Sequence, residues 1–363
     1  MGNIKKIEAN NRLDLAYCRL LNSYYKLMTL PKLTDLEVSG KRVIVRLDLD
    51  VEDDYTRLEF AEETLDYLVA KRSRLIIIGH KGRPEGEKLS ELSLAPIAEV
   101  LGGVVGEKVN FFSDTVGYES KKRADMLSEG EILLLENLRF DPGEEKNDDE
   151  FSKRLSELGE VYVNEAFAVS HREHASIVGL PKFLPHAAGF RFLKEVETLD
   201  GILNAPKRPI VLVIGGLKKD KIEYINNFKN IVDKILVGGR LPLFFNEESP
   251  DNDKIIMGKL IPDKEDITIH TIEKFKEEIA NAKTVIVAGV PGKYEDIGHR
   301  QGTQEVFKAI AASSAFKIAG GGDAEAAITE FGLNDKFDWI SIGGGAMLEY
   351  LTKRTLPGIE VLL

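Results

Sequence analysis

Charged side chains follow the apolar runs in the first half of this sequence, and their types suit the binding of an anion. Asp48 and Asp50 come after RVIVRL, and His80 and Arg83 come after RLIIIG. Further candidates are, in chain order, Arg57 at the start of a helical stretch, Arg139, Asn164, His171, Arg172 and His174. A guanidinium group can bind phosphate or carboxylate through two hydrogen bonds. One arginine alone would be more simply a surface cation, but four at successive strand ends predict a site for a small, multiply charged anion.

The second half ends its apolar runs in glycine instead. These glycines are Gly215, Gly216, Gly238, Gly239, Gly289, Gly292, Gly320, Gly321, Gly322, Gly343, Gly344 and Gly345. Glycine lets a backbone approach a ligand closely, and the N–H groups at a helix start attract phosphate. Tight strand-to-helix turns would also explain any one of them. Together with Lys218, Lys221 and Asp323, they predict a site for a nucleotide with a magnesium ion, although the sequence has neither a GxxxxGK[ST] nor a GxGxxG motif.

Short runs of Val, Ile and Leu alternate with helical patterns from residue 41 onward, and they must position these groups. The runs are RVIVRLDLD, RLIIIGH, EILLLENLRF and VYVNEAF in the first half, and PIVLVIGG, KILVGG, TVIVAG, FKIAGGG and WISIGGG in the second. Nearly continuous apolar runs between helices are typical of parallel strands that are buried on both faces. In such sheets, ligands bind at the carboxyl ends of the strands.

The same pattern predicts the domain organisation. Residues 1–28 are expected to form a helical N-terminal extension, because Leu13, Ala16, Leu20, Tyr24 and Leu27 recur at helical spacing. A first α/β domain is expected over residues 29–186 and a second over 204–350. A connecting helix is expected over residues 187–203, between pairs of prolines. Residues 351–363 are expected to return towards the first domain.

Composition limits the classes of function. The chain has 363 residues and a formal net charge of −11, which argues against a general nucleic-acid or membrane-surface binder. The one cysteine, Cys18, excludes an intramolecular disulfide and suits a reducing compartment. No apolar stretch approaches the ~20 residues that span a bilayer. We expect a soluble cytoplasmic protein, a monomer that acts on small molecules.

Taken in order, the motifs resemble those of the phosphoglycerate kinase family. The matching segments are GKRVIVRLDLD, GHKGRP, LLLENLRF, EEKND, VYVNEAFAVSHREHAS, KRPIVLVIGG, GGGDA, ISIGGGAMLEYL and LPGIEVL, which together extend from about Leu30 to Leu363. Their order and spacing are more specific than any single motif. The resemblance implies an α/β fold of two Rossmann-like parallel-sheet domains joined by an interdomain helix.

The resemblance also implies an activity and a set of site residues. The activity is reversible phosphoryl transfer between 1,3-bisphosphoglycerate and MgADP, which gives 3-phosphoglycerate and MgATP. The implied substrate site comprises Asp48, Asp50, Arg57, His80, Arg83, Arg139 and Arg172. The implied nucleotide site comprises Gly216, Lys218, Lys221, Gly238, Gly239, Gly292, Glu295, Gly321, Gly322, Asp323, Ala324, Gly343, Gly344 and Gly345. In this comparison Glu295 holds the ribose, Asp323 holds Mg²⁺ through the nucleotide, and Arg57 and Lys218 are catalytic.

Five features depart from the family pattern. Asp50 stands where asparagine is usual, and the loop GGLKKDKI is one residue short. Ala288 replaces an asparagine, and Ala324 and Ile342 replace threonines near the phosphates. We expect an active kinase; the alternatives are a weakened or inactive relative that serves as a binding or interaction module, and a kinase for another small molecule.

Overall fold

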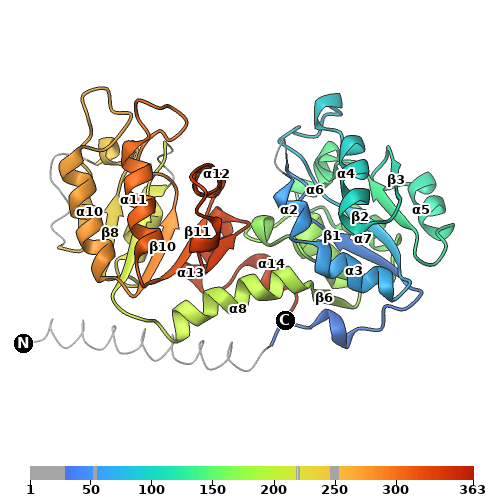
Figure 1. Ribbon diagram of the computed structural model, residues 1–363. Coiled ribbons are helices and arrows are strands. Elements are labelled where there is room, and N and C mark those ends of the chain that lie inside the picture. Colours follow the sequence, from blue (N-terminus) through green and yellow to red (C-terminus); the bar gives the residue numbers. More distant parts are fainter. Residues whose placement is uncertain (1–28, 52–54, 218, 220, 246–252) are drawn as a thin grey trace, which may run out of the picture.

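The computed structural model describes residues 29–51, 55–217, 219, 221–245 and 253–363, and within them the chain forms two parallel sheets. Each sheet has six strands, in the orders β3-β4-β2-β1-β5-β6 and β12-β11-β10-β7-β8-β9. Figure 1 shows the two sheets in separate lobes, with the helix α8 (Phe190–Asn204) running beneath both. This arrangement confirms the expected fold class.

The first lobe contains strands β1 to β6, and the second contains β7 to β12. Their bounds are β1 Arg42–Arg46, β2 Arg74–Ile78, β3 Val109–Phe112, β4 Ile132–Leu135, β5 Val161–Asn164, β6 His186–Ala188, β7 Ile210–Ile214, β8 Lys234–Val237, β9 Ile255–Met257, β10 Thr284–Ala288, β11 Phe316–Gly320 and β12 Trp339–Ser341. The helices other than α8 are α2 Thr56–Glu59, α3 Glu62–Ala70, α4 Ala95–Val105, α5 Tyr118–Asp125, α6 Pro142–Glu145, α7 Asp149–Ser156, α9 Lys221–Phe228, α10 Ile269–Asn281, α11 Gln301–Ala312, α12 Gly322–Glu330, α13 Gly344–Lys353 and α14 Pro357–Glu360.

Alternation along the strands explains why each sheet is covered on both faces. In β1, Val43 and Val45 point to one face and pack with Leu65 of α3, whereas Ile44 points to the other face and packs with Phe151 of α7. The second sheet repeats this arrangement, with α10 and α11 on one face and α9 and α13 on the other. Strands that are buried on both faces must be apolar at every position, which is the pattern seen in the sequence.

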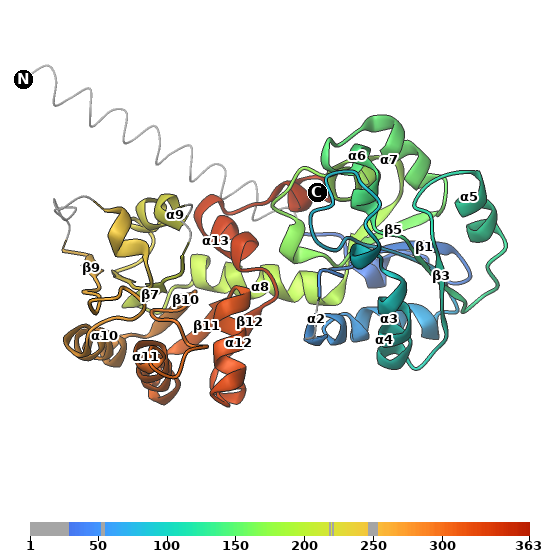
Figure 2. The same cartoon turned by 90° about the horizontal axis from the view of Figure 1, so that it is seen from above.

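The helix α8 joins the lobes through one continuous apolar core. Phe192, Val196 and Leu199 of α8 belong to a cluster that includes Ile44 of the first sheet and Leu212 of the second. Figure 2, seen from above, shows α8 passing between the two lobes. The C-terminal segment also crosses between lobes, because the Gly358 N–H donates to the carbonyl oxygen of Ser170 at 2.9 Å.

Three local features differ from the sequence expectations. The connecting helix begins at Phe190, because Ala187 and Ala188 pair with β5 as part of β6. The helical stretch after Asp50 is split into α2 and α3 around Phe60 and Ala61. The short strands β3, β6 and β9 were not predicted. The expected helix in residues 1–28 lies outside the described residues.

Within the described residues, no helix combines the length and apolar character needed to cross a membrane.

Candidate active site

The order of the first sheet brings the predicted anion-binding residues to one edge. Strands β4, β2, β1 and β5 are neighbours and run parallel, so their carboxyl ends lie side by side. The side chains that follow these four ends are Arg139 after β4, His80 and Arg83 after β2, Asp48 and Asp50 after β1, and Arg172 after β5. Residues that are far apart in the chain are thereby gathered at one place.

The loop GHKGRP is fixed from both sides. A side chain at Gly79 would place its Cβ 2.4 Å from the Leu49 Cδ1 atom, so only glycine fits between the ends of β1 and β2. Gly82 has a φ of +63°, a conformation that favours glycine. Its N–H donates to Asp50 Oδ1 at 2.8 Å, and its carbonyl oxygen accepts from Arg139 Nη1 at 2.6 Å. Asp50 and Arg139 therefore shape the loop that carries His80 and Arg83.

The charge of this edge resides on arginines. Burial lowers the pKa of His80 well below its usual value, and the charges of Arg46, Arg139 and Arg172 lower it further. Burial followed by the same arginines lowers the pKa of His174 to about 3. Both histidines are therefore neutral at physiological pH. Arg83 is exposed at the end of the loop, and Arg172 is half-buried.

Arg46 belongs to this group although sequence analysis did not select it. Its side chain is fully buried at the end of β1. Its Nε donates to Ser176 Oγ at 2.9 Å, its Nη1 donates to the Leu47 carbonyl oxygen, and its Nη2 lies 3.0 Å from His80 Nδ1. The available signal was an arginine between the apolar residues Val45 and Leu47, because a charge that is buried there requires partners.

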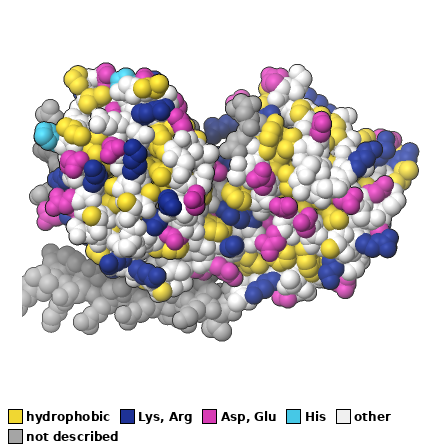
Figure 3. All heavy atoms as spheres, in the orientation of Figure 1, with side chains coloured by type: hydrophobic (Ala, Val, Ile, Leu, Met, Phe, Trp, Pro, Cys, Tyr) yellow, Lys and Arg dark blue, Asp and Glu magenta, His cyan; other side chains and the backbone are white. Residues whose placement is uncertain are grey.

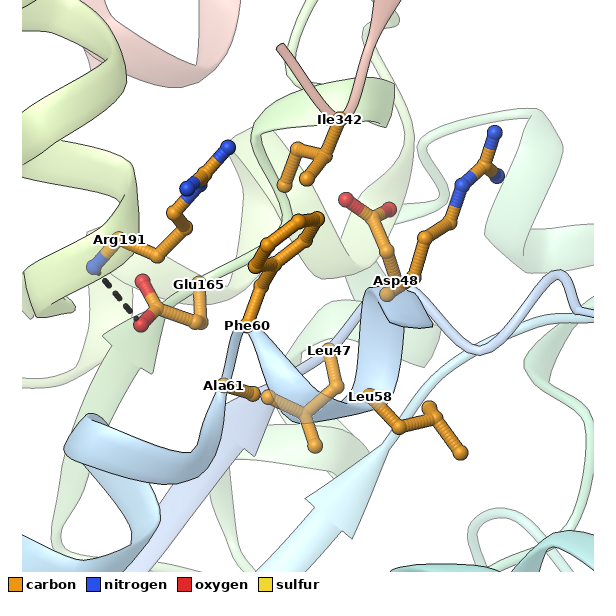
Figure 4. A pocket seen from close by; sticks show the side chains of 9 residues that line it. Leu47, Asp48, Leu58, Phe60, Ala61, Glu165, Arg191 and Ile342 are labelled. Atoms are coloured by element: carbon orange, nitrogen blue, oxygen red, sulfur yellow. Dashed lines mark hydrogen bonds between the residues drawn. The ribbon is translucent and has the colours of Figure 1, made fainter. Parts of the chain in front are cut away.

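Asp48 and Arg57 line a hollow between the two lobes. Its other lining residues are Leu47, Leu58, Phe60, Ala61, Glu165 and Arg191, with Ile342 from the second lobe. Figure 4 shows Asp48 on one side of this hollow and Ile342 above it. Asp48 accepts a hydrogen bond from the Ala168 N–H at 3.1 Å, and burial raises its pKa to about 6 against the opposing charges of Arg46 and Arg57. Arg57 Nη1 donates to the Asp50 carbonyl oxygen at 3.2 Å.

A buried carboxylate connects the same hollow to the start of α8. Glu165 accepts hydrogen bonds from Thr64 Oγ1 at 2.5 Å and from the N–H groups of Arg191 and Phe192 at 3.0 and 2.9 Å. The Arg191 bond is drawn in Figure 4. Burial raises the Glu165 pKa to about 7, and these hydrogen bonds oppose the rise. Glu165 thus fixes the N-terminus of α8 to the first lobe.

The side chains of Glu195 and Arg191, both on α8, fix this helix to the second lobe. Glu195 accepts from Trp339 Nε1 at 2.9 Å and from the Ile342 N–H at 3.0 Å. The Arg191 guanidinium carbon lies 4.1 Å from the Phe60 ring centre and 3.9 Å from that of Trp339, and its Nη2 donates to the Ile340 carbonyl oxygen at 2.5 Å. Because Phe60 belongs to the first lobe and Trp339 to the second, Arg191 links them directly. Sequence analysis selected none of Glu165, Arg191 and Glu195.

In the second lobe, the glycines allow neighbouring strand-end loops to pack backbone against backbone. A Cβ at Gly215 would lie 2.1 Å from the Val290 carbonyl oxygen, and one at Gly239 would lie 2.4 Å from the Gly216 nitrogen. A Cβ at Gly344 would lie 2.5 Å from the Gly321 Cα. These contacts form a surface of main chain across the ends of β8, β7, β10, β11 and β12. At this surface the N–H groups of Gly215 and Gly239 donate to the carbonyl oxygens of Ala288 at 3.4 Å and Pro291 at 2.7 Å.

The polar side chains of the second lobe are more dispersed. Lys221 Nζ donates to the carbonyl oxygens of Gly215 and Ala288 at 2.7 and 3.0 Å. Glu295 and Asp323 are both exposed. Burial is the largest cause of the raised pKa of Tyr294, and the charges of Glu295 and Asp323 raise it further. Their carboxylates therefore lie near one phenol, Glu295 in the loop after β10 and Asp323 at the start of α12. Lys218 lies outside the described residues.

Other predicted nucleotide-site positions have evident packing roles. A Cβ at Gly292 would lie 1.9 Å from Asp266 Oδ1, and both backbone polar groups of Gly292 bond to Thr303 Oγ1. Ala324 is fully buried in the core, and Ile342 is buried beside the interlobe hollow. A Cβ at Gly238 would lie 2.7 Å from the Pro291 Cα. At Gly292 and Gly238, the glycine is therefore required by packing regardless of any ligand.

The start of α13 faces the first lobe across the cleft. A Cβ at Gly343 would lie 2.5 Å from the Ala168 Cα, and one at Gly345 would lie 3.8 Å from His171 Nε2. The surface is hollowed between the two lobes in Figure 3. The positive N-terminal end of α13 is therefore close to the arginine-rich edge, an arrangement that suits a shared anionic ligand. Among the described residues, no group of three or more His, Cys, Asp or Glu side chains could hold a metal ion by itself.

Comparison with known proteins identifies relatives along most of the chain. The family model described as phosphoglycerate kinase matches residues 33–252 and 246–354. The phosphoglycerate kinase of Thermomicrobium roseum is 37% identical over 384 residues, covering 91% of this chain and 98% of that protein. The phosphoglycerate kinase of Finegoldia magna is 37% identical over 391 residues, with the same two coverages.

Solved structures agree with the sequence comparison. The phosphoglycerate kinase from Pyrococcus horikoshii superposes with a TM-score of 0.80 at 27% identity, covering 92% of this chain and 98% of that chain. The phosphoglycerate kinase from Coxiella burnetii gives a TM-score of 0.75 at 29% identity, covering 92% and 99%. The two-lobe fold is thus shared with enzymes of this name.

Proposed function

The chain belongs to the phosphoglycerate kinase family, and we propose that it catalyses reversible phosphoryl transfer between 1,3-bisphosphoglycerate and MgADP, giving 3-phosphoglycerate and MgATP. It is accordingly a transferase of glycolysis, and the relatives do not favour the alternative of a non-catalytic module. The observation that carries the proposal is the convergence of Arg46, Arg139 and Arg172 around the neutral His80 at one sheet edge.

The first lobe is proposed to bind the phosphoglycerate. Arg83, Arg139 and Arg172 supply charge, and His80 supplies a neutral donor. Asp48 lies at the same edge, where its carboxylate can accept a hydrogen bond from the substrate hydroxyl, and Asp50 lies beside the bound anion. The role of Asp50 is supported by its hydrogen bond to Gly82, which shapes the loop between His80 and Arg83.

The second lobe is proposed to bind the nucleotide. Gly216, Gly239 and Gly321 allow close backbone contacts between the strand-end loops, over which phosphate would lie, and Glu295 would hold the ribose. Asp323 fits a magnesium ion, because it is exposed in the first turn of α12 beside Gly321 and Gly322. Mg²⁺ is commonly held by one or two carboxylates together with substrate phosphates. When bound, it would neutralise charge on the nucleotide phosphates.

The reaction needs positioning and charge neutralisation more than proton transfer. The attacking oxygen, from the ADP phosphate or the substrate carboxylate, is already ionised, so no general base or covalent nucleophile is required. Arg57, Lys218 and the N-terminal end of α13 are proposed to stabilise the moving phosphoryl group. Arg57 supports this role by lining the hollow that Ile342 of the second lobe also lines.

Closure of the two lobes about α8 is proposed to bring the ligands together and exclude water. The residues that would have to transmit this motion are Glu165, Arg191 and Glu195, which fix α8 to one lobe or the other. A monomer in the cytoplasm that acts on small molecules, without nucleic acid or membrane, completes the proposal. The net charge of −11 supports the absence of a general nucleic-acid surface.

A coupled assay with 3-phosphoglycerate and MgATP tests the proposal. We expect turnover that requires both substrates and falls at least tenfold in Asp323→Asn. The matched control is Asp335→Asn, an exposed aspartate of the same lobe, which should leave the rate unchanged. Binding of 3-phosphoglycerate without turnover by the parent protein would instead support the binding-module alternative.

A further inference from the structure

Four buried polar groups beneath the arginine-rich edge form a continuous chain of hydrogen bonds. Ser176 Oγ donates to Glu144 Oε1 at 2.6 Å, and Arg46 Nε donates to Ser176 Oγ at 2.9 Å. Arg46 Nη2 then lies 3.0 Å from His80 Nδ1. Glu144, Ser176 and Arg46 are fully buried, and His80 is nearly so. The chain connects α6, the short helical segment Ala175–Gly179, β1 and the end of β2.

The chemistry of these groups permits one arrangement of protons. A guanidinium can only donate, so His80 Nδ1 must accept the hydrogen bond from Arg46. The carboxylate of Glu144 accepts from both the Ser176 N–H, at 2.9 Å, and the Ser176 hydroxyl. The Ser176 oxygen is thereby left to accept from Arg46. A neutral imidazole with an accepting Nδ1 carries its proton on Nε2.

We propose that Arg46, with Ser176 and Glu144 behind it, is a positioning residue that holds His80 in the neutral Nε2–H form. His80 then offers the bound phosphoglycerate one hydrogen-bond donor and no charge. This inference rests on the proposed function for the identity of the ligand, but the proton arrangement belongs to the protein alone.

The surroundings of His80 oppose its protonation from every side. A second proton on Nδ1 would face an N–H of Arg46 from β1. The other charged or titratable groups that act on the ring are Arg139 from the segment after β4, and Arg172 and His174 from the segment after β5. Burial of the ring, followed by the charges of three arginines, thus keeps it neutral. Binding of an anion is then independent of histidine titration in the neutral range.

The network around Ser176 is held independently of the ligand. Tyr162 OH donates to the Ser176 carbonyl oxygen at 2.8 Å, which fixes the backbone of the serine. Burial raises the pKa of Glu144, and the charge of Arg46 and the two bonds from Ser176 oppose this rise. A buried arginine is costly unless such partners exist. The arrangement therefore places a compensated charge where it can orient a histidine.

Nitrogen-15 NMR of the histidine side chains in the full chain tests the proton arrangement directly. The His80 signal can be assigned by its absence in His80→Gln. We expect the Nε2–H tautomer in the parent protein, with no protonation of His80 between pH 8 and pH 6. An Nδ1–H tautomer, or protonation of His80 within that range, would overturn the proposal.

Two serine variants separate positioning from general stability. Ser176→Ala removes the acceptor for Arg46 Nε, and it should mix the His80 tautomers and raise KM for 3-phosphoglycerate about tenfold with little change in kcat. The matched control is Ser152→Ala. This serine is also fully buried in the first lobe, but its hydroxyl donates to the Asp148 carbonyl oxygen and takes no part in the hydrogen bonds that lead to His80. It should leave both the tautomer and KM unchanged.

The outcomes distinguish this inference from the proposed function. A tautomer effect in Ser176→Ala without any binding of 3-phosphoglycerate by the parent protein would contradict the proposed function and leave the proton arrangement intact. KM could instead change equally in Ser176→Ala and Ser152→Ala, with the His80 tautomer unaltered. This result would show that the hydrogen bonds from Glu144 to His80 only stabilise the core, and it would overturn the positioning role of Arg46.

Discussion

The two lobes share one architecture but equip their strand ends in opposite ways. Both contain six parallel strands with helices on both faces. The first lobe gathers arginines and histidines at the ends of β4, β2, β1 and β5, whereas the second lobe gathers glycines whose loops pack main chain against main chain. One lobe therefore presents charged side chains at its strand ends, and the other presents backbone.

This difference shows what kind of site a sequence reveals. The type of a charged side chain at a strand end already indicates which ligands it can bind. Only its neighbours need to be inferred from the sheet order. A glycine leaves two explanations open until its surroundings are known. Gly292 illustrates the second case, because Asp266 and Thr303 fully account for it.

The largest effect is expected from Arg57→Ala, which removes the charge proposed to act on the transferring phosphoryl group. Turnover should fall by ~100- to 1000-fold, the range seen when a transition-state donor is lost. Nucleotide affinity, measured by calorimetry, should stay within about twofold because Arg57 belongs to the first lobe. Lys122→Ala, an exposed cation of the same lobe, is the control. A two- to threefold loss of turnover in Arg57→Ala would show the catalytic assignment to be wrong.

The link between the lobes should break with Arg191→Ala. This change removes the contacts with Phe60 and Trp339 and leaves the buried Glu195 without its charged partner. We expect a loss of about 3 kcal/mol in the free energy of unfolding, typical of a broken buried pair. Trp339 is the only tryptophan in the chain, so its fluorescence reports on this contact. Unchanged stability together with unchanged emission would contradict the role of Arg191.

Stability should depend on pH through Asp48. Its pKa is raised from 3.8 to about 6, so between these values the folded protein binds more protons than the unfolded chain. Ionisation of Asp48 therefore destabilises the fold as pH rises through this window. Asp48→Asn should gain stability relative to the parent between pH 4 and pH 7, by about 3 kcal/mol in total. Urea unfolding at several pH values measures the difference; a relative stability that falls with pH would contradict the assignment.

The smallest effect is expected from Asp50→Asn. Asparagine keeps an acceptor for the Gly82 N–H but removes a negative charge beside the proposed anionic ligand. The affinity for 3-phosphoglycerate should tighten several-fold at low salt, and the gain should shrink as salt screens the exposed site. Weaker binding at low salt would mean that the Asp50 carboxylate is itself a ligand.

Most of the fold could be predicted from the sequence, because nine of the strands are apolar runs that neighbouring helices bury on both faces. Strands β3, β6 and β9 could not be predicted in this way, because their segments VNFF, HAA and IIM are too short to form such a run. The start of α8 was predicted too early because Ala187 and Ala188 suit a helix by type, yet they pair with β5 at the sheet edge. Tertiary pairing overrode local preference there.

The site was predictable in the same uneven way. Arginines in loops after strands were selected, but Arg46 lies within a strand, and its role depends on His80 and Ser176, which are distant in sequence. The interlobe residues look like ordinary surface charges in the sequence: Arg191 and Glu195 belong to α8, and Glu165 follows β5. Only the contacts with Thr64, Trp339 and Ile342 show that Glu165 and Glu195 are buried and that α8 is joined to both lobes.

The division of labour between the lobes is tested most directly by calorimetric titration of 3-phosphoglycerate and of MgADP into Arg139→Ala. Arg139 lies in the first lobe and bonds to the loop that carries His80. We predict that this variant binds 3-phosphoglycerate at least tenfold more weakly than the parent protein and binds MgADP with unchanged affinity. Weakened binding of MgADP with unaltered binding of 3-phosphoglycerate would contradict the assignment of the two ligands to the two lobes.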